Sequence, residues 1–431
     1  MLLIMIFNFL VGMTDIYVAG FIGPEVQAVV GFVSQLFFLN IIIANAVSIA
    51  TIALLARSIG AGDFDGAVKI ARQSLIFGIL AALALMIAGI AFPREIVAIA
   101  GFPENIWSIA ERFIRIFALS LGPNYILIIS NAVFRASGEV KKVLVTMFLV
   151  SAVNIIGNFV LVFGIPPFPK MGYIGIALST ALAVTAGMII NFILFAFSRW
   201  RAIYKAPAKV SGDTIKKIIS LSWPAALLQA AWNAGSILLY NILGRLGSIS
   251  ITALAALTNG LRIEAIIYLP AYALNMAAAV LVGQNLGAKN AARAEEVGWK
   301  IVSSGIALIS VMAIIIFIWA ETFASIVTSN PSVLKETVRY LRFNMVSEPF
   351  MALSSILGGG LQGAGDTRGT MRIIIIAMWV IRLPLAYLLA LGLGFGARGV
   401  WTAMVISMVI QGILMAHRFR DGLWKGITLE H

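Results

Sequence analysis

The sequence predicts an all-α membrane protein with twelve transmembrane helices in two homologous six-helix lobes. Composition, the length of the apolar runs and an internal repeat predict this fold. Of the 431 residues, 61% are hydrophobic and only 11% are charged, whereas globular proteins carry charge on roughly a quarter of their positions. Apolar runs of about 20 residues cross a bilayer core of about 30 Å, and such runs must be helical because no water satisfies their backbone groups.

Twelve such runs are expected, and glycine and proline punctuate their ends. In chain order they are 1–21, 26–57, 67–97, 103–134, 142–164, 172–198, 216–243, 249–285, 292–324, 331–362, 370–393 and 397–419. Several are longer than a bilayer requires, so we expect those helices to tilt, bend or project beyond it.

Lys and Arg residues give the orientation. Most of the 31 basic residues lie in alternate connections, from Arg57, Lys69 and Arg72 through to Arg418 and Arg420. The positive-inside rule places these connections and both termini in the cytoplasm, as in a multi-pass protein of the cell (inner or plasma) membrane. The net charge of +13 therefore reflects topology and contact with membrane lipid, and no nucleic acid partner is expected.

The chain also repeats itself at an offset of about 225 residues. The segment ARSIGAGDFDGAVKIA matches GQNLGAKNAARAEEVG, and FRASGEVKK matches LQGAGDTRG. Six helices per lobe leave both lobes in the same orientation, related by a pseudo-two-fold axis along the membrane normal, with a central cleft as in a transporter. The expected domains are an N-lobe (1–198), a cytoplasmic linker (199–215), a C-lobe (216–425) and a tail (426–431) whose final LEH resembles an expression tag.

Asp15 interrupts the first apolar run, NFLVGMTDIYVAGF. A carboxylate at the centre of a membrane helix costs about 2.5–3.5 kcal/mol, so it marks a functional site unless a helix contact satisfies it. The run ends near residue 21, which puts Asp15 about 9 Å below the outer surface. By the same measure Asn158 and Thr180 lie at that depth, and Asn154 lies one turn deeper on the face of Asn158.

Four oxygen-bearing side chains of one lobe are therefore expected to meet at one level. Oxygen ligands suit a hard cation such as Na⁺, and one carboxylate neutralises one monovalent charge. Alternatively, Asp15 carries a proton. Asn8 lies two turns below Asp15 on the same helix face and either lines a path inward or makes a packing hydrogen bond.

The second lobe lacks this set, because Leu239 stands at the position that corresponds to Asp15. Its polar residues are each interpreted as either substrate contacts or structural pairs. These candidates are Gln229, Asn233, Tyr240, Asn241, Arg262, Glu264, Glu348, Trp379 and Arg382.

Enzyme chemistry finds no support in the sequence. There is no cysteine, and the only two histidines are His417 and His431, at the C-terminal end. No Walker loop, HExxH or GxSxG motif occurs. We therefore expect no cofactor, no catalytic residue and no metal other than Na⁺ at the Asp15 site.

The motifs resemble those of the multidrug and toxic compound extrusion (MATE) family over essentially all of 1–425. They include MTDIYVAGFIGPE, FRASGE and GYIGIALSTA in the first half and VGQNLGAKNAARA and LQGAGDTR in the second. The resemblance implies twelve helices in two lobes and export of organic, often cationic compounds driven by inward Na⁺ or H⁺. It also implies an N-lobe ion site, whose positions match Asp15, Asn154, Asn158 and Thr180.

Two features depart from the family pattern. Asn158 stands where the family usually has a carboxylate, so the site carries one negative charge instead of two. The chain also begins inside the first helix, without the usual polar lead and proline, and we interpret the start as truncated or misassigned.

The sequence thus predicts an antiporter, coupled to Na⁺ or H⁺, that exports lipophilic organic compounds by alternating access and works as a monomer. Two alternatives remain open. A flippase of a lipid-linked precursor would need a strongly cationic cleft for its pyrophosphate. A membrane sensor or scaffold would keep the fold without transport.

Overall fold

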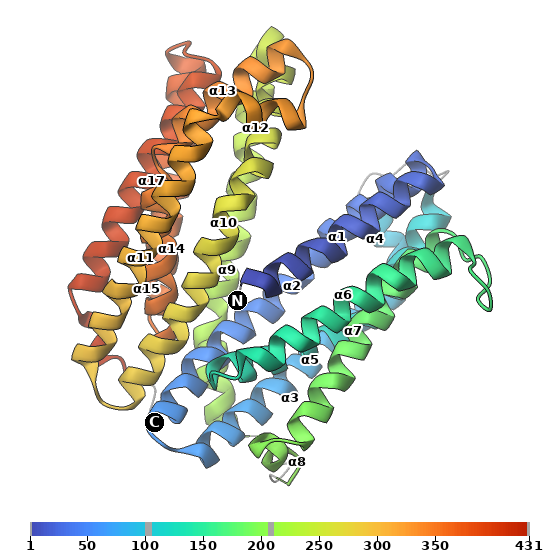
Figure 1. Ribbon diagram of the computed structural model, residues 1–431, viewed down its shortest axis with the longest axis vertical. Helices are drawn as coiled ribbons and strands as arrows, with labels where there is room; N and C mark the ends of the chain where they lie inside the picture. Colours follow the sequence, from blue (N-terminus) through green and yellow to red (C-terminus); the bar gives the residue numbers. More distant parts are fainter. Residues whose placement is uncertain (1, 100–105, 206–210, 429–431) are drawn as a thin grey trace. The chain divides into compact units, whose positions relative to one another are not determined.

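The computed structural model describes residues 2–99, 106–205 and 211–428, which are mainly helical and contain no strand (Figure 1). The chain divides into two compact units, Met1–Ser222 and Trp223–His431. The first unit contains α1 (Leu2–Ile22), α2 (Pro24–Gly60), α3 (Phe64–Ala91), α4 (Pro93–Ile99), α5 (Trp107–Ala136), α6 (Val140–Phe163), α7 (Tyr173–Ala196), η2 (Arg199–Arg201) and α8 (Ala202–Lys205). Helix α9 (Gly212–Gly244) passes through the boundary.

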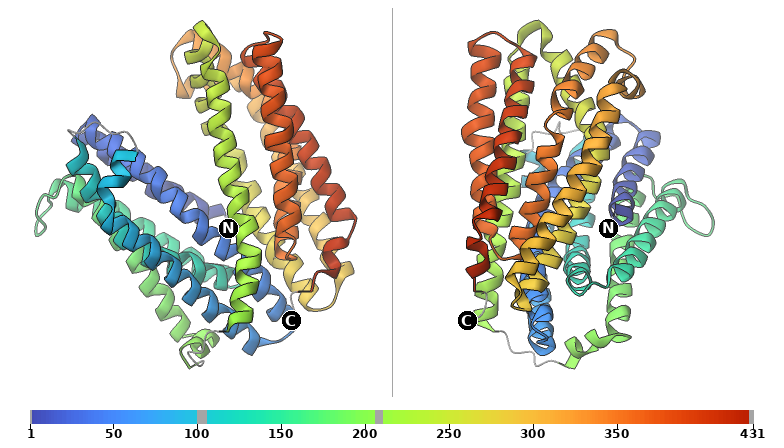
Figure 2. Two further views of the ribbon diagram at one scale, coloured as in Figure 1. Left: turned by 180° about the vertical axis from the view of Figure 1, so that it is seen from behind. Right: turned by 60° about the vertical axis from the view of Figure 1, so that its left-hand side comes forward.

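The second unit contains the rest of α9 and a second series of helices (Figure 2). They are η3 (Gly247–Ile249), α10 (Ser250–Gly287), α11 (Ala291–Ile318), α12 (Ala320–Val327), α13 (Pro331–Met345), α14 (Glu348–Gly363), α15 (Thr367–Ile375), η4 (Ile376–Arg382), α16 (Leu383–Tyr387), η5 (Leu388–Gly392), α17 (Ala397–Arg420) and η6 (Leu423–Gly426). Segments η4 and η5 are π-helices.

Ten helices in the described part of the chain are long and apolar enough to cross a membrane. Helix α9 and the α13–α14 pair do not meet those criteria, although helix forms over both of the corresponding expected spans. The chain is therefore an all-α, multi-pass membrane protein, as the composition predicts.

Four expected spans differ from the helices observed. The span 67–97 breaks at Phe92, between α3 and α4, where Pro93 opens the next helix. The expected span 331–362 is broken at Val346–Ser347, where Pro349 opens the next helix, since proline is well accommodated in a first turn. The span 292–324 breaks at Trp319, between α11 and α12. The span 370–393 contains the two π-helices. The first turn of the span 103–134 lies outside the described residues.

The packing within each unit repeats, as the internal sequence repeat predicts. In the first unit, α5 packs against α2, α3 and α7. In the second, α14 packs in the same way against α10, α11 and α17. Helix α6 packs along α7, and the segments from η4 to η5 pack along α17.

The helices that open the two series are held differently. Helix α1 packs closely against α2, α6 and α7. Within the described chain, the backbone of helix α9 packs less closely against every other helix than the backbone of α1 packs against α2, α6 and α7. Side chains hold it instead: the Tyr240 hydroxyl lies 3.3 Å from Thr258 Oγ1, and Trp379 Nε1 donates to the Ala231 carbonyl at 3.1 Å.

The GAGD motif begins a helix in each unit. Asp63 accepts from Gly66 N at 2.8 Å, and Asp366 accepts from Gly369 N at 3.1 Å. Both are N-caps, which satisfy backbone donors that the first helical turn leaves free. These acids are therefore structural.

The expected linker joins the first unit, because its start packs onto the ends of α3 and α6. Trp200 is fully buried, lies 5.1 Å from the Phe64 ring and donates from Nε1 to Glu139 Oε1 at 2.9 Å. Glu139 also pairs with Lys142 and, at 3.6 Å, with Arg199 Nε. Partial burial raises the pKa of Glu139, but the hydrogen bonds from Lys142 and Trp200 and the charges of Lys142 and Arg199 outweigh it, and the pKa is lowered.

We expect Glu139→Ala to lower the free energy of unfolding by about 1 kcal/mol, since a charged hydrogen bond is lost at a partly exposed site. A lowered pKa means that the contribution is complete above the ordinary value of 4.5 and is lost as pH falls through the folded-state pKa. Thermal unfolding in detergent at pH 7 and below pH 4.5 should therefore show a difference that shrinks in acid.

Glu296→Ala is the matched control, because Glu296 forms solvent-exposed ion pairs with Arg293 and Lys300 on α11. It should leave the melting temperature unchanged at both pH values. Equal effects of the two substitutions would contradict a role of Glu139 in fastening the linker.

Candidate functional site

Three helices of the first unit bring Asp15, Asn154, Asn158 and Thr180 into one hydrogen-bonded cluster. Asn158 Nδ2 donates to Asp15 Oδ1 at 2.7 Å, and Asn154 Nδ2 donates to the same oxygen at 3.2 Å. The Thr180 hydroxyl donates to Asp15 Oδ2 at 2.9 Å. Asp15 comes from α1, the two asparagines from α6 and Thr180 from α7. The four residues that the depth argument selected therefore lie in direct contact.

Burial makes this cluster electrostatically strong. Asn154 and Asn158 are 0% exposed, and Asp15 and Thr180 are only 7% and 6% exposed. The two asparagines are also joined, since Asn158 Nδ2 lies 3.2 Å from Asn154 Oδ1. Three donors on one carboxylate solvate its charge in place of water, which is the condition for burying it.

One oxygen of the cluster is left over. Asn158 Oδ1 is buried and has no hydrogen-bond partner among the described residues. A buried polar atom without a partner costs about 1–3 kcal/mol, so it indicates either strain or a ligand. With the Asp15 carboxylate, the amide oxygen of Asn154 and the Thr180 hydroxyl, it completes a set of oxygens suited to a monovalent hard cation.

Glycines allow α6 and α7 to approach closely enough for Asn154 and Thr180 to meet. A Cβ atom at Gly157 would lie 2.9 Å from Ser179 Cβ, and one at Gly175 would lie 2.9 Å from the Leu161 main-chain carbon. Both contacts are too short for real side chains. The Asn154 Nδ2 to Thr180 Oγ1 distance of 2.9 Å depends on this packing.

A second buried polar cluster lies in the same unit and escaped the sequence interpretation. Asn191 Nδ2 donates to Ser130 Oγ at 2.6 Å and to Asn131 Oδ1 at 2.9 Å, and Thr146 Oγ1 donates to Asn191 Oδ1 at 2.7 Å. These residues join the C-terminal halves of α5 and α7 to the N-terminal half of α6. Asn131 and Asn191 lie in apolar runs at matching depths, and this pattern could have predicted the cluster.

Most of the C-lobe candidates form no cluster. Asn233 bonds within its own helix, to the Gln229 carbonyl at 2.8 Å, and Asn241 and Arg262 are exposed. Leu239, at the position corresponding to Asp15, is buried in the apolar core. Tyr240 contacts Thr258, as described above. In the first unit, the side chain of Asn8 lies outside the described residues.

Three charged candidates lie inside the second unit. Glu348 is 6% exposed and Arg382 is 4% exposed, and Oε1 of Glu264 is buried. Fully buried Tyr340 lies close enough to all three to interact with their charges. Glu264 comes from α10, Glu348 begins α14 and Arg382 ends η4.

The residues that hold Arg382 were not singled out from the sequence. Its Nε donates to Ser407 Oγ at 2.8 Å, and its guanidinium carbon lies 5.1 Å from the centre of the Trp232 ring. Trp379, which was singled out, is 38% exposed and bonds to the carbonyl of Ala231, beside Trp232. Trp232 and Ser407 are ordinary residues for membrane helices, so only the fold reveals their role.

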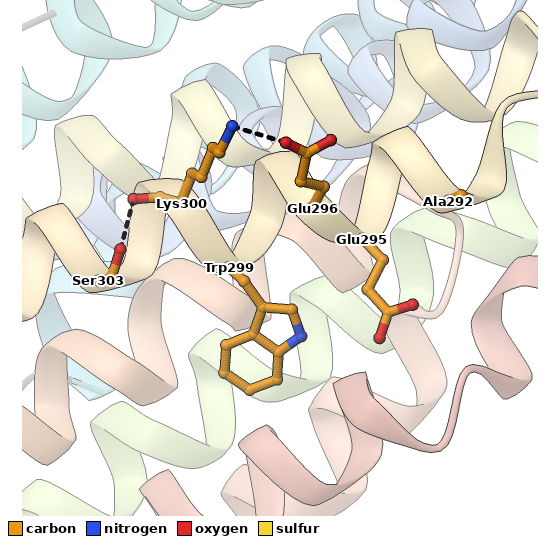
Figure 3. Close-up of a pocket in the computed structure, with 6 residues that line it drawn as sticks. All are labelled: Ala292, Glu295, Glu296, Trp299, Lys300 and Ser303. Carbon is orange, nitrogen blue, oxygen red and sulfur yellow. Dashed lines mark hydrogen bonds and ion pairs between the residues drawn. The ribbon is translucent and has the colours of Figure 1, made fainter.

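A hollow of about 640 Å³ lies along the N-terminal half of α11 (Figure 3). Its polar groups already have partners: Lys300 Nζ pairs with Glu296 at 2.6 Å, Glu295 pairs with Lys425, and Ser303 Oγ donates to the Lys300 carbonyl at 3.0 Å. One helix supplies all the lining residues. The hollow is therefore a solvated helix face.

The described residues contain no group of three His, Asp or Glu side chains that could hold a metal ion. The Asp15 cluster instead combines one carboxylate with amide and hydroxyl groups. The chemistry available to such a set is the binding and release of a single positive charge.

Comparison with known proteins agrees with this architecture. The MatE family model matches residues 1–160 and 224–388. A curated relative, the uncharacterized transporter YisQ of Bacillus subtilis (strain 168), is 23% identical over 404 residues, covering 93% of this chain and 88% of the relative. The probable multidrug resistance protein NorM of Thermotoga maritima is 25% identical over 427 residues, covering 97% and 90%.

Solved structures share the fold. A mutant of the Vibrio cholerae MATE transporter VcmN has a TM-score of 0.90 at 19% identity, covering 98% of this chain and 94% of that chain. A MOP superfamily transporter from Pyrococcus furiosus has a TM-score of 0.87 at 20% identity, covering 97% and 93%.

We expect Asn154→Ala to lower the free energy of unfolding by about 1.5–3 kcal/mol, because it removes a donor from a buried carboxylate and a partner from Thr180. Thermal unfolding of the purified protein in detergent measures the change. Asn233→Ala is the control, since Asn233 donates only to its own helix, and it should cost less than about 1 kcal/mol. Similar losses for the two variants would contradict the central place of Asn154 in the cluster.

Proposed function

The chain belongs to the MatE family of membrane transporters, and from this premise we propose that it is a cation-coupled antiporter that exports lipophilic, often cationic organic compounds. Members of this family are transporters and not enzymes. The proposal concerns the coupling ion, the substrate class and the residues that couple them.

The Asp15 cluster is the observation that carries the proposal. A transporter driven by an ion gradient needs a buried group whose charge changes when the ion binds. Asp15 is such a group, and three donors stabilise it. The buried, unpartnered Asn158 Oδ1 beside it supports a cation as the ligand.

The geometry suggests how an ion would exchange with these donors. Asn158 turns its amide so that Oδ1, and no longer Nδ2, faces the space beside Asp15. A Na⁺ ion then takes carboxylate, amide and hydroxyl oxygens, whereas a proton would bind directly to the carboxylate. Either event removes the net negative charge, and the conformation with the higher affinity for the ion becomes more populated.

Other features support the substrate class and the setting. The Thermotoga maritima relative is named a probable multidrug resistance protein, which favours organic substrates here. The distribution of Lys and Arg favours a cell-membrane protein with both termini in the cytoplasm. A monomer suffices, because all four residues of the coupling site come from one chain.

Asp15→Asn should reduce ion-driven efflux at least about tenfold, because the amide binds neither a proton nor a cation as the carboxylate does. Efflux of a fluorescent organic cation from vesicles, with Na⁺ and pH gradients imposed separately, measures this effect and identifies the ion. Asp213→Asn is the control, since Asp213 is exposed at the start of α9, and it should transport normally.

Wild-type efflux in the Asp15→Asn variant would rule out Asp15 as the coupling group. Flux that is absent from the wild-type protein under both gradients would favour a non-transporting sensor. Movement of a lipid-linked pyrophosphate, but of no organic cation, would favour a flippase.

Asn158→Asp should raise the affinity for Na⁺ about tenfold or more. Asn158 Nδ2 lies 2.7 Å from Asp15 Oδ1, so the substitution would place two carboxylates in contact, and like charges at that distance need a shared cation or proton. Equilibrium binding of radioactive sodium in detergent at alkaline pH checks this expectation. Asn158→Leu should instead weaken binding, and an unchanged affinity in both variants would place the ion elsewhere.

A further inference from the structure

Two buried polar clusters lie along the same helices of the first unit. The Asp15 cluster includes Asn154 of α6 and Thr180 of α7. The second, the Asn191 cluster, includes Thr146 of α6 and Asn191 of α7. The two levels are eight residues apart on α6 and eleven residues apart on α7, and both spacings stay on one face of a helix. The clusters therefore share one interior and lie about 12 Å apart along α6.

A single apolar layer separates the two clusters. It consists of Leu127 on α5, Val150 on α6 and Gly187 on α7, and the leucine and the valine are each only 3% exposed. A Cβ atom at Gly187 would lie 2.5 Å from Val150 Cγ2 and 3.1 Å from Leu127 Cδ1. The two side chains therefore close over Gly187 and leave no room for a methyl group. Val150 is four residues from both Thr146 and Asn154, midway between the clusters.

Asn124 extends the polar surface from the Asp15 cluster to this layer. It lies three residues before Leu127 on α5, on the same helix face and one turn nearer to the level of Asn154. Asn124 is 6% exposed, and its Nδ2 is buried and has no hydrogen-bond partner among the described residues. Such a donor indicates a place for a polar ligand such as water. An ion that leaves Asp15 in this direction could therefore keep part of its hydration.

The Asn191 cluster lies near the other end of the three helices. Asn131 is five residues before the end of α5, and Thr146 is six residues after the start of α6, so the cluster lies about 8 Å below that end. Arg135, Lys142 and Arg199 mark this end, and the distribution of basic residues favours its placement in the cytoplasm. An ion that reaches the Asn191 cluster is therefore close to cytoplasmic water.

The Asn191 cluster offers oxygen ligands without charge. Ser130 Oγ and Asn131 Oδ1 accept from Asn191. The Asn191 carbonyl oxygen accepts from Thr146, and all four residues are at most 5% exposed. Amide and hydroxyl oxygens are ligands for a hard cation such as Na⁺, but they bind no proton at physiological pH. Without a carboxylate the cluster would hold Na⁺ only weakly, as a site of transit requires.

We propose that Na⁺ leaves the Asp15 cluster for the cytoplasm through the interior of α5, α6 and α7. The Asn191 cluster is a neutral second Na⁺ site on this path, and Leu127 and Val150, closed over Gly187, form the gate between the two sites. The inference rests on the proposed cation coupling at Asp15. It adds the identity of the ion, a second binding site and the inner gate.

The apolar layer accounts for the absence of leakage through such a path. A dry apolar constriction blocks ions, because an ion would have to shed its water to enter it. Since Gly187 has no side chain, a small separation of α7 from α5 and α6 would open a gap between the two polar clusters. The gate therefore opens by movement of a helix and needs no charged group.

The test measures uptake of radioactive sodium into vesicles that contain the full-length protein and no organic substrate. Leu127→Asn should raise this leak at least about tenfold, because a polar side chain of similar size admits water to the constriction. Val150→Thr should also leak. Leu121→Asn is the matched control, because Leu121 is 4% exposed on the same helix but packs in a cluster with Ala44 of α2 and Ala82 of α3. It should not leak.

Two further variants test the sites at the ends of the path. Asp15→Asn in the Leu127→Asn background should lower the leak again, since the path begins at that carboxylate. Asn191→Leu should lower Na⁺-driven efflux of an organic cation about tenfold, because an apolar side chain replaces a cation ligand on the path. Equilibrium Na⁺ binding in detergent should change little in Asn191→Leu, because Asp15 provides the tighter site. A purely structural role of Asn191 would lower both together with the melting temperature.

A leak that is absent from both Leu127→Asn and Val150→Thr would overturn the gate, as would an equal leak through Leu121→Asn. If Leu127→Asn does not fold, Val150→Thr decides alone, since it changes only one methyl group to a hydroxyl. Unchanged Na⁺-driven efflux in Asn191→Leu, or wild-type efflux driven by a pH gradient alone, would overturn the second Na⁺ site. Efflux by the Asp15→Asn variant tests coupling separately, so failure here is distinguishable from failure of the proposed function.

Discussion

The structure depends on one constraint: a charge placed among membrane helices must be solvated by the protein itself. Asp15 satisfies this constraint with three donors from two neighbouring helices. Those donors reach it only because glycines let α6 and α7 pack closely. The close packing of α6 and α7 is therefore what stabilises the carboxylate of Asp15. Any ligand that enters must replace the hydrogen bonds of these donors.

The two lobes share the same helix packing but stabilise their buried charges with different residues. In the N-lobe, α1 is packed tightly and brings the carboxylate into a ring of neutral donors. In the C-lobe, the equivalent helix α9 is held by side chains and presents Trp232 to Arg382. The internal repeat thus gives both lobes the same helix packing. Differences between corresponding positions, such as Asp15 in the first lobe and Leu239 in the second, change what each lobe can bind.

The sequence was sufficient for the fold class and for the Asp15 cluster because both follow from simple regularities. Apolar length predicts the helices, and the depth of polar residues from helix ends predicts which side chains share a level. It was not sufficient for the breaks at Phe92, Val346–Ser347 and Trp319 or for the π-helices. Proline accompanies the breaks at Phe92 and Val346–Ser347. The break at Trp319, the π-helices and the role of Trp232, a residue type that membrane helices commonly contain, depend on packing between helices.

In the proposed antiport, the single negative charge of the Asp15 cluster has a consequence for coupling. With Asn158 in place of an acid, one bound cation or proton brings the site to neutrality, and a second has no charge to meet. Asn158 compensates through its amide, which offers a donor to the bare carboxylate and an oxygen to an ion. A residue with both functions can keep the buried site solvated in either state, which a second carboxylate cannot do without its own counter-ion. The substitution therefore fits a site that binds its ion weakly enough to release it.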